Sequence, residues 1–128
     1  MLFRSGIGGE VAQGLDAMGL PLIVAAYLVT MAMRIAQGSA TVAATTGASI
    51  MAPAIMAGDF SSVAVAAMVI AIGAASIGWS HVNDSGFWLI GKFCGFDTVT
   101  TFKTWSLVGT TISLLGFALS AVVFVIAA

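Results

Sequence analysis

Charged residues are scarce in this sequence: only 7% of its 128 residues are Asp, Glu, Lys or Arg. Soluble domains carry about 25% charged residues, and a soluble chain of this length needs them to cover its surface. Hydrophobic residues make up 60% of the chain, and the mean hydropathy is +1.13. The composition therefore excludes a soluble domain and indicates an integral membrane protein.

Cysteine and histidine are also rare, with one of each, at Cys94 and His81. A single cysteine excludes an internal disulfide framework, and a net charge of -1 offers no basic surface to nucleic acid. A metal site would need more ligands than His81, Asp84 and Cys94 supply. Ser80, His81, Asp84 and Ser85 resemble a hydrolytic set, but they lack an oxyanion hole and the usual sequence context. We therefore expect no metal, no other cofactor and no catalytic residues.

Long apolar segments dominate what is present, and there is no strand pattern, which predicts an all-α membrane protein. The segments cover residues 19–36, 40–57, 62–80 and 105–128. Eighteen helical residues reach roughly 27 Å, near the thickness of the hydrocarbon core. Small residues recur on one face of the second and third segments, a pattern that lets helices approach closely in lipid: Ala40, Ala44, Ala48 and Ala52, with Ala43 and Gly47 beside them, and then Ala67, Ala71 and Ala75. A polar connection with Lys92, Asp97 and Lys103 precedes the last segment.

A polar decapeptide, WSHVNDSGFW, interrupts this pattern at residues 79–88. One interpretation is a surface loop with Trp79 and Trp88 as interface anchors. The alternative is a discontinuous membrane helix, because the apolar piece at 87–93 would reach only about 10 Å as a helix. Such breaks bind substrates and ions in secondary transporters, and membranes tolerate them only where they line a cavity or are buried in protein.

A second polar interruption, at residues 37–39, follows Arg34. Arg34 is either an interfacial arginine that reaches the headgroups or part of a hairpin tip inside the membrane, where it needs a cavity or a partner. The planar guanidinium suits a carboxylate ligand, and Gly38 permits a tight turn. Ser39, Thr41 and the first N–H groups of the next helix add donors where the helix dipole favours an anion.

Two motifs and the segment that follows them resemble the C-terminal part of the gluconate permease family. They are RIAQGSATVAATTGASIMAP (residues 34–53) and HVNDSGFWLI (residues 81–90), followed by FKTWSLVGTTISLLG. The resemblance spans essentially the whole chain. That family comprises bacterial gluconate:proton symporters and relatives that carry D-serine and other sugar acids. Its members are several times longer, so the chain resembles a C-terminal fragment.

The resemblance implies half of an inverted-repeat carrier in the bacterial inner membrane, with several membrane passes. Residues 1–128 would be the C-terminal part of a single transmembrane transporter domain. Residues 19–57 would form a re-entrant helical hairpin, 62–93 a broken transmembrane helix and 104–128 the final transmembrane helix. Both polar interruptions would then meet near the middle of the membrane.

The same resemblance implies a mechanism of proton-coupled uptake. The substrate would be a small anionic or zwitterionic carboxylate, such as gluconate, another aldonate or D-serine. Its expected ligands are Arg34, Gln37, Gly38, Ser39, Thr41, Asn83 and Ser85. His81 and Asp84 are the expected proton-coupling groups, because histidine titrates near neutral pH and burial can bring a carboxylate toward it. The expected partners are the lipid bilayer and the rest of the transporter chain, with a homo-oligomer left open and no nucleic acid.

The competing hypothesis is a small structural membrane subunit without transport of its own. Helices rich in small residues suit that role as well. The two hypotheses differ in geometry: in a structural subunit Arg34 and residues 81–84 should lie apart among headgroups, whereas in a carrier they should converge inside the bundle.

Overall fold

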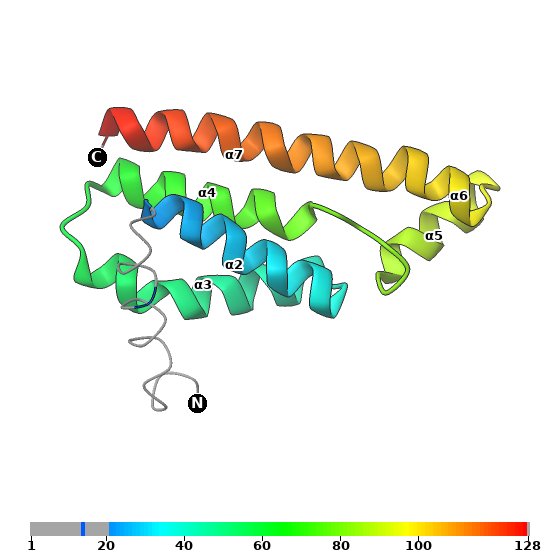
Figure 1. Ribbon diagram of the computed structural model, residues 1–128, viewed down its shortest axis with the longest axis horizontal. Helices are drawn as coiled ribbons and strands as arrows, with labels where there is room; N and C mark the ends of the chain where they lie inside the picture. The colour runs from blue at the N-terminus through cyan, green and yellow to red at the C-terminus, as the bar shows by residue number, and fades with distance from the viewer. Residues whose placement is uncertain (1–13, 15–20, 128) are drawn as a thin grey trace.

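The structure is a computed structural model that describes residue 14 and residues 21–127 (Figure 1). Regular structure in these residues is entirely helical, as the sequence predicts. The helices are α2 (Leu22–Gln37), α3 (Ala40–Ala57), α4 (Ser62–Ile77), α5 (Ser85–Cys94), α6 (Thr98–Thr101) and α7 (Leu107–Ala127), with a π-helical turn η2 (Phe102–Ser106) between the last two.

Helices α2 and α3 form a hairpin around a turn at residues 38–39. Gly38 ends α2 in the left-handed conformation, at φ 71°, which glycine adopts without steric cost. Ser39 is the N-cap of α3, and its side chain accepts a hydrogen bond from the Val42 N–H. Pro53 does not end α3, which continues to Ala57. Residues 19 and 20 of the predicted hairpin lie outside the described residues.

The third apolar segment ends as a helix at Ile77, three residues before the predicted end at Ser80. Residues 78–84 are not helical, and α5 then begins at Ser85. Trp79 has a φ of 45°, a left-handed conformation that a bulky residue rarely adopts. Residues 78–84 are therefore a true interruption between two helices, and their backbone is strained at Trp79.

The final helical run, which joins α6, η2 and α7, begins at Thr98 and so earlier than the expected start at residue 104. Residues from Thr98 to Ala127 form one helical run of 30 residues, and Lys103 lies within it. Asp97 caps its first turn, and the hydroxyls of Thr101 and Thr104 donate to carbonyls four residues earlier. Because these hydroxyls bond back to the helix, polar residues that look like a loop are accommodated in helical structure.

The hydrophobic core lies where α2, α4 and α7 pack together, with α3 against α2 and α4 (Figure 1). The predicted small face of α4 is buried, at Ala67, Ala71 and Ala75. The buried row of α3 contains Ala43 and Gly47 rather than the Ala40 row. A Cβ at Gly47 would lie 2.1 Å from Thr30 Oγ1, so this glycine sets how closely α3 approaches α2.

Two helical runs in the described part of the chain are long and apolar enough to cross a membrane: α3 and Thr98–Ala127. The apolar helices α2 and α4 are shorter, with 16 residues each. Large apolar side chains are exposed on the outside of the bundle, and examples are Met56, Phe93, Leu119, Val125 and Ile126. Such a surface suits lipid or further membrane helices better than water.

Candidate functional site

The two polar interruptions meet at one end of the helical bundle, on the side toward α5 (Figure 1). Arg34, in the last turn of α2, is only 3% exposed. Its guanidinium bridges both interruptions. Nε donates to the Gly78 carbonyl at 3.1 Å, Nη1 to the Gly38 carbonyl at 2.5 Å and Nη2 to Asp84 Oδ2 at 2.5 Å. Arg34 is therefore a buried arginine with a partner, not an arginine extended toward the surface.

Asp84 supplies the negative charge of the cluster and is 8% exposed. It is the N-cap of α5, where Oδ1 accepts from the Gly86 N–H at 2.9 Å. Its other oxygen, Oδ2, accepts from both Arg34 and the Ser80 hydroxyl. A buried ion pair is stable only when further hydrogen bonds satisfy its remaining atoms. This carboxylate receives those bonds from Ser80 in the break and from Gly86 in the first turn of α5, so the break is organised around it.

The start of the last helix also reaches this cluster. Trp105, in the π-helical turn, donates its indole N–H to Ser80 Oγ at 3.1 Å, and the Ser106 hydroxyl donates to the Ser80 carbonyl. The polar atom of Trp105 is therefore used in a contact between the last helical run and the break. Single π-helical turns occur often at functional sites. Sequence reasoning missed the roles of Ser80, Trp105 and Ser106, although the tryptophan beside a run of hydroxyl residues was a usable signal.

Side chains of the break also satisfy the free carbonyls at the end of α2, which have no partner within the helix. Asn83 Nδ2 donates to the Ile35 carbonyl at 3.0 Å and to the Ala36 carbonyl at 3.5 Å. His81 Nε2 lies 3.0 Å from the Ile35 carbonyl. Because a carbonyl only accepts, this nitrogen donates. A Cβ at Gly38 would lie 2.3 Å from the Asn83 carbonyl oxygen, so the two interruptions touch.

The two expected proton-coupling groups have different side-chain partners. His81 contacts the end of α2 through Ile35, whereas Asp84 pairs with Arg34. A backbone hydrogen bond of 2.8 Å from the Asp84 N–H to the His81 carbonyl joins their backbones in a turn. The structure thus places both groups in the break but gives them separate environments.

Several expected substrate ligands lie at the edge of this cluster. Gln37 is exposed, and its amide contacts the Met33 sulfur at 3.9 Å. Ser39 caps α3, Thr41 is exposed on the first turn of α3, and Ser85 is exposed as the first residue of α5. Among the expected residues, the structure therefore joins Arg34, Gly38, Asn83, His81 and Asp84 most closely.

A cavity of about 360 Å³ borders the ion pair. Its lining comprises Arg34, Ala40, Ile77, Ser80, Asp84, Gly86, Trp105, Val108, Gly109 and Ile112. The volume falls in the usual range of ligand pockets, about 300–1,000 Å³. The first turns of α3 and α5 contribute Ala40 and Gly86, so two helix N-termini with their positive dipole ends face this space. The remaining wall is largely apolar.

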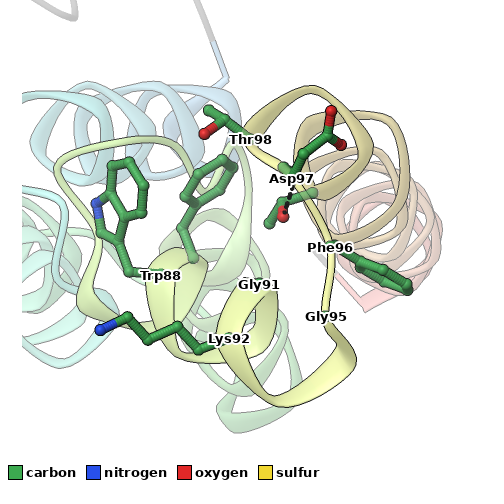
Figure 2. Close-up of a pocket in the computed structure, with 9 residues that line it drawn as sticks. Trp88, Gly91, Lys92, Gly95, Phe96, Asp97 and Thr98 are labelled. Carbon is green, nitrogen blue, oxygen red and sulfur yellow. Dashed lines mark hydrogen bonds between the residues drawn. The ribbon is translucent and has the colours of Figure 1, made fainter.

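A second cavity, of about 430 Å³, lies where α5 meets α6 and is shown in Figure 2. It is lined by Lys92 and Trp88 from α5 and by Asp97 from the connection, and it contains none of the expected site residues. Hydrogen bonds from the side chain and backbone N–H of Thr100 lower the pKa of Asp97 below its usual value. This cavity is distinct from the meeting point of the two interruptions.

The fold and the cluster together define a class of protein. Helices interrupted in apolar surroundings, whose breaks meet at a buried charged pair, are typical of membrane transport proteins. Across residues 1–126 the sequence matches the family described as GntP family permease. The chain belongs to this family of membrane permeases, as the resemblance in its two motifs predicted.

Individual relatives support the same family. The chain is 40% identical over 124 residues to the low-affinity gluconate transporter of Escherichia coli strain K12. The matched segment covers 97% of this chain and 28% of that protein. It is 40% identical over 116 residues to a gluconate permease of Bacillus subtilis strain 168, covering 91% of this chain and 25% of that protein. The chain thus spans about a quarter of the length of these relatives. No solved structure matches it significantly.

Proposed function

We propose that the chain is the C-terminal part of a secondary carrier that takes up gluconate, or a similar hydroxy- or amino-carboxylate, together with protons. The observation that carries this proposal is the contact between the two interruptions through Arg34 and Asp84. A structural subunit has no need to bury a charged pair at that point, where each charge costs several kcal/mol unless it is compensated. Family membership favours the carrier over the structural subunit as well.

The substrate carboxylate binds at Arg34, on the side that faces the 360 Å³ cavity. The guanidinium has five N–H donors. Three hydrogen bonds from it go to Gly78, Gly38 and Asp84. The dipoles at the N-termini of α3 and α5 add to the attraction for an anion. The candidate contacts at the rim of the cavity are Gln37, Ser39, Thr41, Asn83 and Ser85. Gly38 allows the turn to approach the break.

The hydroxyl groups of a sugar acid need more polar partners than this cavity provides, because most of its wall is apolar. The relatives are about three and a half times as long as the chain. The remaining partners therefore come from the rest of the transporter, which packs against the exposed apolar faces together with lipid. In this proposal, Arg34 and its neighbours bind the carboxylate end of the substrate, and the rest of the transporter binds its hydroxyl groups.

The proposed arrangement in the membrane follows from helix lengths. Helices α2 and α4 have 16 residues each, about 24 Å, which is less than the roughly 30 Å hydrocarbon core. Short arms that meet at a polar cluster support a re-entrant hairpin and a broken helix in an inverted-repeat carrier. The long run Thr98–Ala127 then forms the final span in a multi-pass protein of the bacterial inner membrane. Assembly into a homo-oligomer is compatible with this arrangement.

Uptake of labelled gluconate into vesicles that contain the intact carrier tests this function. Uptake should require a functional Arg34 and should increase when a pH gradient, acidic outside, is imposed. The Arg34→Gln variant should lose uptake, whereas Lys92→Gln, at an exposed lysine of α5, should retain it. Transport by Arg34→Gln with unchanged apparent affinity would remove the proposed carboxylate site.

A further inference from the structure

Asp84 occupies the position on Arg34 that a substrate carboxylate would take. Its Oδ2 lies 2.5 Å from Nη2 of Arg34, and the pair borders the cavity. A side-chain carboxylate and a substrate carboxylate have the same geometry and charge, so both fit a guanidinium in the same way. The structure therefore shows Arg34 in contact with an internal equivalent of the proposed ligand.

We propose that the substrate carboxylate and the Asp84 carboxylate compete for Arg34, and that a proton bound to Asp84 decides the competition. This inference rests on the proposed function of the Arg34 site. A proton from solution binds a carboxylate oxygen of Asp84, and the ion pair with Arg34 is replaced by a pair between Arg34 and the incoming carboxylate. No covalent bond other than the new O–H forms, and the proton leaves again when Asp84 returns to Arg34.

Charge balance at the site explains why the two events occur together. Before the exchange, Arg34 and Asp84 have charges that sum to zero; afterwards, Arg34 and a monovalent substrate sum to zero and Asp84 is neutral. Substrate without a proton would leave two carboxylates beside one guanidinium, and a proton without substrate would leave an unpaired guanidinium. Both states place a net charge in a low-dielectric site, which is costly. One proton therefore accompanies one substrate molecule.

Few titratable or charged groups other than Asp84 itself lie close enough to Arg34 to bind the coupled proton. From α2, Asp84 faces Arg34, and from its own break it faces the Ser80 hydroxyl. His81 is the other titratable group of the break and contacts Ile35 instead. Helix α5 contributes the Gly86 N–H. The residues that α3, η2 and α7 contribute to the cavity have no charge; they are Ala40, Trp105, Val108, Gly109 and Ile112.

Gluconate binding to the purified intact carrier, measured by calorimetry over a range of pH, tests the exchange. If only the form with protonated Asp84 is competent, the apparent dissociation constant should rise about tenfold per pH unit once that form becomes a minority. Titrations in buffers of different ionisation enthalpy should show one proton taken up per gluconate bound. This proton uptake is measured on the wild-type protein and needs no variant to fold.

Asp84→Asn should bind gluconate with an affinity that no longer depends on pH and that equals the wild-type affinity in acid. The matched control is Asp97→Asn, the same substitution at an exposed carboxylate outside the cluster, which should keep the wild-type pH dependence. His81→Gln should also keep it. A pH dependence that disappears in His81→Gln and persists in Asp84→Asn would overturn the exchange and assign coupling to the histidine.

The outcomes separate this inference from the function on which it rests. If the wild type binds gluconate, Arg34→Gln does not, and no proton is taken up, then the carboxylate site stands and the exchange is wrong. If Arg34→Gln binds gluconate like the wild type, or if the wild type binds none, then the proposed site itself fails.

Discussion

The turn between α2 and α3 and the break between α4 and α5 both interrupt apolar helices, but they bring opposite chemistry to their meeting point. The turn, at residues 38–39, is short. Together with the last turn of α2, it offers carbonyl acceptors and the Arg34 cation. The break, at residues 78–84, is longer and offers side-chain donors and the Asp84 carboxylate. Neither interruption satisfies all of its own polar groups, because the α2 carbonyls accept from Asn83 while Asp84 and the Gly78 carbonyl accept from Arg34. Each therefore requires the other, which explains how both persist in a chain with so few charges.

The largest expected effect follows from removing the charge of the turn. Arg34→Gln leaves Asp84 without its cation and the Gly78 and Gly38 carbonyls without a guanidinium donor. Breaking a buried pair in this way costs about 3–5 kcal/mol. Thermal unfolding of the intact carrier in detergent should show a large loss of stability. A variant as stable as the wild type would indicate that the two interruptions do not depend on this pair.

Contact between the two backbones is tested by a pair of glycines. Gly38 and Gly95 both end helices in the left-handed conformation, at φ 71° and 68°. A Cβ at Gly38 would lie 2.3 Å from the Asn83 carbonyl oxygen, whereas a Cβ at Gly95 meets nothing within 4 Å. Gly95→Ala should cost only the conformational penalty of roughly 1–2 kcal/mol. Gly38→Ala should cost clearly more, and equal losses in thermal unfolding would argue against a close approach.

Two amides give a smaller and finer comparison. Asn83, in the break, donates to the Ile35 and Ala36 carbonyls, whereas Gln37, beside the turn, contacts only the Met33 sulfur among the described hydrogen bonds. Asn83→Ala should therefore lower stability by about 0.5–1.5 kcal/mol, and Gln37→Ala should have less effect. Denaturant titration of the two variants measures the difference. The reverse order would show that the break does not cap α2.

The smallest expected effect lies outside both interruptions, at Asp97. Hydrogen bonds from Thr100 lower its pKa in the folded state. A lowered folded pKa contributes stability above the unfolded pKa and loses it as pH falls through the folded pKa. Asp97→Asn should therefore be slightly less stable than the wild type at neutral pH, and this difference in unfolding free energy should shrink in acid. A difference that grows as pH falls would contradict the cap at the start of the last helix.

The sequence predicted the helical class, the family and the positions of both interruptions, because these depend on composition and on local polar residues. It did not predict where the last helix begins. The threonines near Lys103 look like a loop but bond back to their own helix. It also did not predict that Trp105 and Ser106 would contact Ser80, because those contacts join residues about 25 positions apart and depend on how α7 packs beside α4.

The meeting of the two interruptions was expected, but the ion pair that joins them was not. Arg34 needs a buried partner, and Asp84 was one of few carboxylates available, but the resemblance assigned them to different tasks: substrate binding and proton coupling. Their ion pair is a tertiary contact over 50 positions in the chain. Gln37, Thr41 and Ser85 are exposed beside this pair, and their contact with a substrate stays a prediction.

A double-mutant cycle between Arg34 and Asp84 tests the central claim most directly, because it measures whether the two interruptions stabilise each other. The unfolding free energies of the wild type, Arg34→Gln, Asp84→Asn and the double variant are compared in the intact carrier. The ion pair predicts that the double variant loses less stability than the sum of the single losses, by about 0.5–3 kcal/mol. Losses that simply add would contradict the claim that this pair joins the turn to the break.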